Sequence, residues 1–460
     1  MRDLVLGLFW LIAVPLTFIN PAAGIVFWVW DALLSPTELA YSFMQGIETN
    51  KLIAITTLAS FALAKRRRAI FFDRTAAILI AIALLATASY IFALVRSQLL
   101  DDLYMKLLKE MVLAFSIMYL ITTKEWLYVF FLSVTAALGF MGVKEGLIAL
   151  LTAGGHHIVG SRAIGDNNQL AAALVSSIPL MYALWRCTQS RAIRSGFLVS
   201  IFLTVVTVIM TYSRGGFVGL LVMALLFLKG SRHRVLSLAV IAVAGIAMLN
   251  FAPAEWFHRV DTIQDASADE SFMGRVVAWK ISWLIAVDNP VFGGGMHAVQ
   301  MLPVWSYFSR ELGQLDWIPT PPADVLPHAA HSIYFEILGD LGFTGLLFYL
   351  ILFGIALSNC KIARKVALRS NSMPWMIDFS DAIRSGLICY MVTGAALSMG
   401  YYELLFVLVA LSACCRRIAV RLAAEAIVDL PVASVPAQAR IPRMARAVAG
   451  TPRLRFGAPR

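Results

Sequence analysis

Long apolar runs separated by short polar segments dominate the hydrophobic pattern of the chain. Each run is roughly 17–22 residues long, enough for a helix to cross a hydrocarbon core of about 30 Å. Polarity does not alternate along the runs, so the pattern does not indicate a β-barrel. It predicts an all-α polytopic membrane protein. We expect helices at residues 3–19, 20–35, 51–65, 75–97, 103–123, 126–145, 167–186, 196–213, 214–229, 234–252, 334–359, 380–399 and 402–418.

Basic segments between the runs predict which loops face the cytoplasm. They are Lys65–Arg68, Arg191–Arg194, Lys229–Arg234, Lys361–Lys365 and the tail after Arg416. All of these basic segments fall on the same side of the membrane if successive runs cross it in opposite directions. A cytoplasmic N-terminus then requires an even number of crossings. We therefore expect the runs on either side of Asn20-Pro21 to form one broken crossing, which gives about 12 spans.

One large polar segment, residues 253–333, remains on the outer side. At roughly 80 residues it is too long for a simple connector, and residues 270–287 have helical spacing that ends at Asp288-Asn289-Pro290. Its frequent aromatic residues suggest that it rests on the outer leaflet. The predicted parts are residues 1–252 with the first membrane helices, 253–333 as a mostly helical periplasmic loop domain, 334–418 with the last membrane helices, and 419–460 as a disordered basic cytoplasmic tail.

The composition supports a membrane protein and argues against a nucleic-acid partner. Of the 460 residues, 60% are hydrophobic and 14% are charged, and the mean hydropathy is +0.78, which excludes an ordinary soluble domain. The net charge is +11. The positive residues lie between the predicted spans and are not interleaved with aromatic residues, so we expect them to contact membrane lipids.

Two arginines fall at predicted membrane ends. Arg214 precedes Gly215 and Gly216 between two apolar runs. A guanidinium there is costly unless it reaches a lipid phosphate or another anion, and the glycines allow close approach; we favour a lined cavity over a lipid contact. Arg162 lies in a glycine-bounded loop before the run at 167. This loop either binds an anion or only leads into a helix capped by Asp or Asn.

A second pair lies in the predicted outer helix. Arg275 and Trp279 are one turn apart and share a face. The arginine can bind a phosphate and the indole can stack against a sugar ring. The alternative is a cation–aromatic pair on a surface helix, and the sequence alone does not choose between the two.

His328 and His331 precede Glu336 at the start of a membrane run. The spacing of the histidines suggests a metal site, but the surrounding residues offer no second carboxylate cluster, so we predict neither a metal nor a cofactor. His331 as a general base is simpler, because an imidazole with a pKa of about 6.5 accepts protons near neutral pH. In isolation, a helix-capping or interfacial histidine is the better interpretation.

Taken together, these residues favour chemistry on a phosphorylated lipid. The predicted topology places the arginines and His331 on the outer side of the membrane, and the sequence has no nucleotide-binding loop. Arginines can neutralise a departing diphosphate without a metal, while a histidine deprotonates an attacking hydroxyl.

The same motifs resemble those of the O-antigen ligase and polymerase superfamily of bacterial envelopes, in order and in sidedness. The matching stretches are Gly160–Asn168, Ser213–Gly216, Ser271–Arg275 with Trp279, Pro290–Gly295, and His331–Glu336. Ser332 stands where Asn is commoner in the family. The resemblance covers residues 50–418.

The resemblance implies metal-independent, inverting transfer of a glycan from undecaprenyl diphosphate to a sugar hydroxyl of lipid A–core. It implies an inner-membrane protein with a periplasmic active site and, with the predicted topology, cytoplasmic termini. His331 would be the base, and Arg214 and Arg275 would bind the diphosphate. Arg259 and Arg162 are secondary candidates, and Trp279 and Glu336 are further substrate-binding candidates.

Other functions remain open. A polymerase or an O-glycosylation ligase would use the same donor with a different acceptor. A transporter or flippase for the same lipid is less favoured, because the charged residues gather at the outer rim and the sequence shows no internal repeat.

Overall fold

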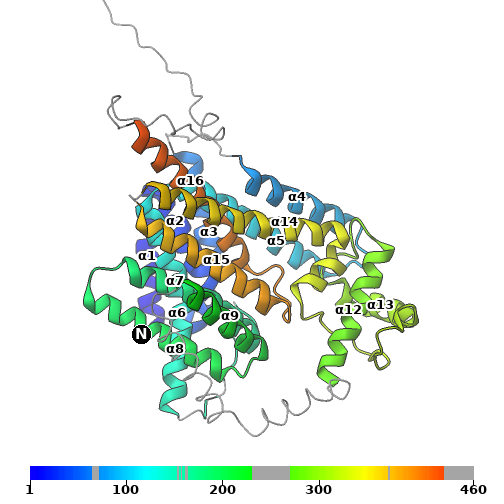
Figure 1. Ribbon diagram of the computed structural model, residues 1–460. Coiled ribbons are helices and arrows are strands. Elements are labelled where there is room, and N and C mark those ends of the chain that lie inside the picture. Colours follow the sequence, from blue (N-terminus) through cyan, green and yellow to red (C-terminus); the bar gives the residue numbers. More distant parts are fainter. Residues whose placement is uncertain are drawn as a thin grey trace, which may run out of the picture.

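The computed structural model describes residues 1–64, 72–152, 155–156, 158–160, 164–230, 270–370 and 373–428, and all regular elements in these ranges are helical (Figure 1). This confirms the all-α fold. The elements are α1 (Arg2–Ile19), α2 (Pro21–Leu34), η1 (Pro36–Leu39), η2 (Phe43–Gly46), α3 (Thr49–Leu63), α4 (Arg74–Ile91), α5 (Gln98–Leu120), α6 (Lys124–Leu151), α7 (Asn167–Cys187), α8 (Arg191–Met210), α9 (Arg214–Gly230), α12 (Glu270–Asp288), η3 (Ala298–Gln300), α13 (Leu302–Phe308), η4 (Ser309–Leu315), α14 (Ile333–Ser370), α15 (Pro374–Gly394) and α16 (Glu403–Val428).

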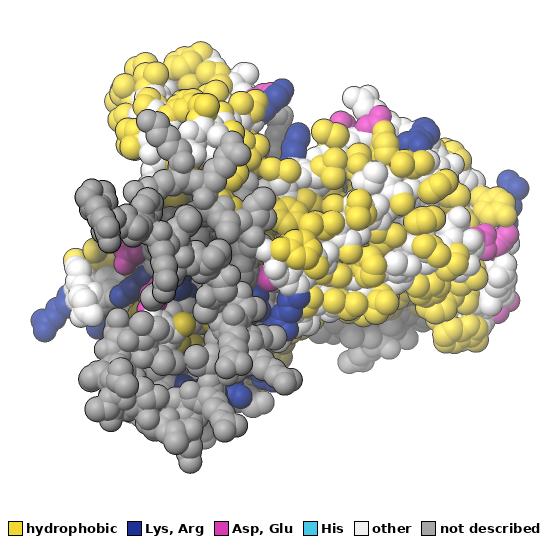
Figure 2. Space-filling view, turned by 90° about the horizontal axis from the view of Figure 1, so that it is seen from above, with side chains coloured by type: hydrophobic (Ala, Val, Ile, Leu, Met, Phe, Trp, Pro, Cys, Tyr) yellow, Lys and Arg dark blue, Asp and Glu magenta, His cyan; other side chains and the backbone are white. Residues whose placement is uncertain are grey.

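Several of these helices fit a membrane protein. Six of the described helices are long and apolar enough to cross a membrane, namely α1, α4, α6, α7, α8 and α14. Three shorter apolar helices lie at Pro21–Leu34, Thr49–Leu63 and Arg214–Leu228. Hydrophobic side chains cover much of the face shown in Figure 2, as expected where a surface meets lipid. The predicted run at 234–252 lies outside the described residues.

The first two helices contradict the predicted broken crossing. Asn20 is extended, and its side chain accepts a hydrogen bond from the Ala22 N–H, so it ends α1 and caps α2. The rings of Phe9 and Trp30 lie 4.9 Å apart, so the two helices fold back on each other as an antiparallel hairpin. The carboxylate of Asp3 accepts hydrogen bonds from backbone N–H groups at residues 41, 42 and 44. The start of α1 therefore lies beside the segment that follows α2.

Two predicted helix ends also differ from the ends in the structure. The chain continues in helix through residues 419–428, so the predicted disordered tail was wrong for that stretch, and the rest of the tail lies outside the described residues. α14 runs to Ser370, beyond the predicted end at 359. In both cases the helix continues through a basic segment that was predicted to lie on the cytoplasmic side.

The described part of the outer segment is largely helical. α12 begins and ends close to the predicted 270–287, and it packs against the first part of α14 (Figure 1). The buried side chains of Ile281, Trp305 and Phe308 belong to a small hydrophobic core in this segment. A separate and larger core lies between the apolar helices. α7 is central in the larger core, and it packs extensively against α15.

The glycine-rich stretch after α12 joins the outer segment to the bundle. α14 is interrupted at Gly342, which has a φ of 70°. The Gly294 N–H donates to the Gly339 carbonyl over 2.8 Å, and the Phe343 N–H donates to the Pro290 carbonyl over 2.9 Å. The loop thus satisfies backbone groups that the broken helix leaves unpaired, which a membrane helix requires. The proline–glycine motif predicted at 290–295 is a structural junction.

Candidate active site

His331 lies in the loop that leads into α14. Its backbone is left-handed, with a φ of 43°, and its N–H donates to Ser398 Oγ over 3.0 Å. A non-glycine residue in this conformation is uncommon and needs support from its surroundings. The bond to Ser398, in the turn between α15 and α16, supplies part of that support and fixes the backbone from which the imidazole projects.

Arg275 lies within electrostatic reach of His331. Partial burial is the largest cause that lowers the pKa of His331 below its usual 6.5, and the positive charge of Arg275 lowers it further. Asp166 and Glu336 act in the opposite direction but do not cancel these effects. The structure therefore brings the predicted base and one predicted diphosphate ligand together, and it favours a neutral imidazole near pH 7.

Trp279 fixes the same loop from α12. Its indole N–H donates to the Ala330 carbonyl over 2.6 Å. Its ring stacks on Phe335 with the centroids 5.0 Å apart and the planes 7° apart. One face of the indole is thus already covered by protein. These contacts hold the residue next to His331 in place.

Arg214 begins α9 after a tight turn in which Tyr212 has a φ of 53°. Asn167 Nδ2 donates to the Thr211 carbonyl over 2.8 Å, which ties this turn to the start of α7. A Cβ on Gly216 would lie 2.8 Å from the Ala171 side chain. Gly216 therefore allows α9 to approach α7 closely and sets the position of the exposed Arg214.

The first turn of α7 also reaches the His331 loop. Gln169 Nε2 donates to the Ser398 carbonyl over 2.8 Å, and Ser398 Oγ accepts from His331. Asp166 caps α7 through a reciprocal capping box with Gln169, so the predicted capping role is confirmed. Arg214 and His331 are thus joined to one end of the bundle through the start of α7.

The carboxylate of Glu336 is buried and faces the protein. Its Oε2 accepts from the Gly400 N–H over 2.8 Å, and its Oε1 lies 3.4 Å from His297 Nε2. Burial opposes protonation of His297, but the hydrogen bond and charge of Glu336 outweigh it and raise the pKa of His297. Glu336 therefore connects the start of α14 to both the 398–402 turn and the outer segment.

Arg162 and Arg259 lie outside the described residues. His328 is exposed and pairs with Asp324 over 2.5 Å. Among the described residues, no group of three or more His, Cys, Asp and Glu side chains is arranged to hold a metal ion.

A family comparison covers much of this site. Residues 199–350 match the family described as O-antigen ligase. This region is a domain of the O-antigen ligase superfamily. Residues 1–188 match a second family, DUF5935, whose function is unknown. A search of curated proteins found no match.

The O-antigen ligase match extends from α8 into α14 and includes Arg214, Arg275, Trp279, His331 and Glu336. The start of α7 belongs to the DUF5935 match, and Ser398 lies beyond both matches. The candidate site is therefore assembled from three parts of the chain.

The supporting residues Gln169, His297 and Ser398 were not predicted from the sequence. His297 follows the Pro290–Gly295 motif, a position that could have drawn attention to it. Gln169 stands three residues after the predicted cap Asp166, and this spacing is a known capping signal. Ser398 has no such signal, because its role depends on a turn that meets α7 and α14 only after folding.

Proposed function

We propose that this chain transfers a glycan from undecaprenyl diphosphate to a sugar hydroxyl of lipid A–core at the periplasmic face of the bacterial inner membrane. The transfer inverts the configuration at the sugar C1 and needs no metal. The proposal rests on the superfamily domain and on the site residues. The observation that carries it is the contact of α12 with the His331 loop through Trp279 and Ala330, which places Arg275 near enough for its charge to lower the pKa of His331.

In the proposed step, the acceptor hydroxyl oxygen attacks C1 of the donor sugar from the side opposite the diphosphate. The new C1–O bond forms as the bond to the diphosphate breaks, and the diphosphate leaves with the electron pair. His331 takes the hydroxyl proton. Arg275 and Arg214 neutralise the negative charge that develops on the leaving group, which stabilises the transition state. Arg162 and Arg259 are proposed as additional anion ligands.

Glu336 and Trp279 are proposed as positioning residues. Both Glu336 oxygens are engaged by protein groups, and Trp279 is stacked on Phe335. These contacts favour a role in holding the His331 loop over direct binding of the glycan. Sugar stacking by Trp279 is proposed as an additional role.

The test uses purified full-length protein in nanodiscs, a lipid-diphosphate-linked glycan, and either lipid A–core or no second acceptor. We expect glycan on lipid A–core, at the same rate with and without EDTA. A lengthened donor would identify a polymerase, and transfer to an added acceptor protein would identify an O-glycosylation ligase. Absence of transfer to all three acceptors, with movement of the lipid across vesicles, would replace the proposal with a flippase. Loss of activity in EDTA that one divalent ion restores would contradict metal independence.

A further inference from the structure

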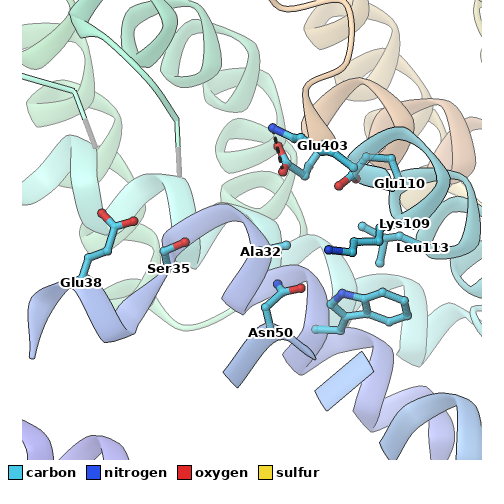
Figure 3. A pocket seen from close by; sticks show the side chains of 10 residues that line it. Ala32, Ser35, Glu38, Asn50, Lys109, Glu110, Leu113 and Glu403 are labelled. Carbon is cyan, nitrogen blue, oxygen red and sulfur yellow. Dashed lines mark ion pairs between the residues drawn. The ribbon is translucent and has the colours of Figure 1, made fainter. Parts of the chain in front are cut away.

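A polar cavity lies near the start of α16 and beside the middle of α5. Its volume is about 380 Å³, and it is bounded by α2, the following 3-10 turn, α3, α5 and α16 (Figure 3). This volume is at the lower end of the range for small-molecule sites, roughly 300–1,000 Å³. None of the candidate active-site residues lines it.

Both apolar and polar side chains line the cavity. Trp28, Ala32 and Leu113 provide apolar atoms, while Asn50, Lys109 and Glu110 provide polar groups, and the labelled side chains surround the same space (Figure 3). A pyranose ring also combines the two, with C–H groups on its faces and hydroxyls at its edges. Hydroxyls both donate to carboxylates and accept from ammonium and amide groups, so a sugar matches this lining.

Two carboxylates in the cavity wall have unused acceptor capacity. Oε2 of Glu110 and Oε2 of Glu403 are buried and have no hydrogen-bond partner among the described residues other than the neighbouring carboxyl group. The two carboxyl groups lie beside each other and bond to each other (Figure 3). A carboxyl pair that shares one proton keeps further lone pairs. Hydroxyls that enter the cavity would donate to these lone pairs.

The charge of the lining argues against a phosphate. Its ionisable residues are Glu38, Glu110, Glu403, Lys106 and Lys109. Lys106 is already paired with Glu403 over 3.3 Å. Glu110 and Glu403 bond to each other, so they do not count as two separate anions. Lys109 is then the one basic residue of the described lining without an ion pair to another lining residue, whereas the candidate active site presents arginines that can bind a phosphate through two N–H groups. The cavity therefore favours a ligand without phosphate.

The cavity connects to the candidate active site through one short segment. Glu403 lines the cavity and follows Gly400, whose N–H binds Glu336. Ser398, two residues earlier, binds the His331 loop. A ligand in the cavity therefore lies at the same end of the bundle as His331.

We propose that this cavity binds an unphosphorylated sugar unit of the acceptor glycan, away from the hydroxyl that reacts. The identification of this sugar as part of the acceptor rests on the proposed function. The binding of a sugar in the cavity does not depend on transfer.

The experiment therefore measures binding and transfer separately, with the full-length protein in nanodiscs. Binding is followed by saturation-transfer NMR with methyl α-glucopyranoside, N-acetylglucosamine and glucose 6-phosphate as probes. Transfer is followed as a function of the lipid A–core concentration. The variants are Ala32→Leu, which fills the cavity, and Glu110→Gln, which keeps the shape and replaces one of the two paired carboxyl groups by an amide. The matched controls are Ala62→Leu, at an exposed position near the other end of α3, and Glu48→Gln, at an exposed carboxylate paired with Lys51.

We expect the neutral sugars to bind the wild type and His331→Ala equally, and Ala32→Leu to abolish binding. In the transfer assay, Ala32→Leu and Glu110→Gln raise the KM for acceptor by about tenfold, or about 1.4 kcal/mol, with the donor KM unchanged. The controls change neither quantity.

Three outcomes separate this proposal from the proposed function. Transfer by the wild type with an unchanged acceptor KM in both cavity variants would overturn the cavity proposal alone. Loss of sugar binding in Ala32→Leu, with no transfer by the wild type to any acceptor, would support the cavity and reject the transferase function. Stronger binding of glucose 6-phosphate than of the neutral sugars, lost in Ala32→Leu, would overturn the cavity proposal in favour of an anion site. Thermal melting of each variant confirms that it is folded.

Discussion

His331, in the loop that leads into α14, combines the properties that a general base needs. His331 is partly buried, its backbone is fixed by Ser398, and its pKa is lowered by burial and by Arg275. A neutral imidazole can accept a proton, and a neighbouring guanidinium can hold an anionic leaving group. Neither residue is distinctive alone, and their proximity is what supports the proposed chemistry.

Replacement of His331 by Gln is expected to lower kcat by about 10²–10⁴-fold, because the acceptor proton loses its base. The measurement is glycan transfer at saturating donor and acceptor, with the melting temperature as the test of folding. His328→Gln is the matched control, since His328 is an exposed imidazole paired with Asp324. Full activity in the folded His331→Gln protein would remove His331 from the mechanism.

Replacement of Arg275 by Gln is expected to change the pH profile as well as the rate. The lowered pKa of His331 means that activity falls only when the pH drops through a value below 6.5, where the imidazole becomes protonated. Removal of the positive charge raises this pKa, so the acidic limb of the kcat profile should move to higher pH. Arg275→Lys should leave the limb near its original position. Identical profiles for Arg275→Gln and the wild type would show that the two groups do not interact.

At the scale of elements, the interruption of α14 joins the outer segment to the bundle. Gly342 has a positive φ, and a Cβ at this position would lie 2.6 Å from the Pro290 carbonyl oxygen. The preceding half of the helix carries Glu336, and the loop that enters it carries His331. The junction therefore sets the position of the candidate base relative to the membrane helices.

Gly342→Ala is expected to destabilise the protein by about 1–3 kcal/mol, because alanine disfavours the left-handed conformation and meets the Pro290 carbonyl. Gly354→Ala on the same helix is the control. A Cβ there meets nothing within 4 Å, so a gain of about 0.5–1 kcal/mol is expected from helix propensity. Thermal melting in detergent measures both. Equal melting temperatures for the two variants would contradict the role given to the junction.

At the scale of the whole molecule, the hairpin of α1 and α2 changes the expected topology. Residues lining the polar cavity come from the second half of α2, the segment after it, the start of α3, the middle of α5 and the start of α16. Asp3 binds the segment between α2 and α3. The start of α1 therefore lies at the same end of the bundle as the candidate site. We propose that residue 1 faces the periplasm, in place of the cytoplasmic N-terminus predicted from the sequence.

Cysteine labelling of intact cells tests this orientation. Arg2→Cys and Gln314→Cys are expected to react with a membrane-impermeant maleimide added outside, whereas Gln189→Cys should react only after the membrane is permeabilised. The positions are exposed at the start of α1, in η4, and between α7 and α8. Protection of Arg2→Cys together with labelling of Gln314→Cys would restore the cytoplasmic N-terminus.

Much of the architecture followed from the sequence because membrane helices are specified locally. Apolar length and helical spacing predicted most helix positions, including α12 in the outer segment, and Asp166 was expected to cap α7. The predictions that were wrong concern the ends of helices. At Asn20-Pro21 the pattern shows that a helix breaks, but whether the chain continues or folds back depends on contacts such as those of Phe9 and Trp30.

The sequence by itself determined the all-helical fold, the candidate residue types and their order, because hydrophobic length and charge act through the solvent and need no partner. Only the tertiary structure decided which of these residues meet. Ser398 lies beside His331, and Asn167 beside the turn that precedes Arg214, because helices distant in the sequence pack at one end of the bundle. The polar cavity also depends on the packing of four helices that are distant in the sequence, and their individual sequences do not predict it.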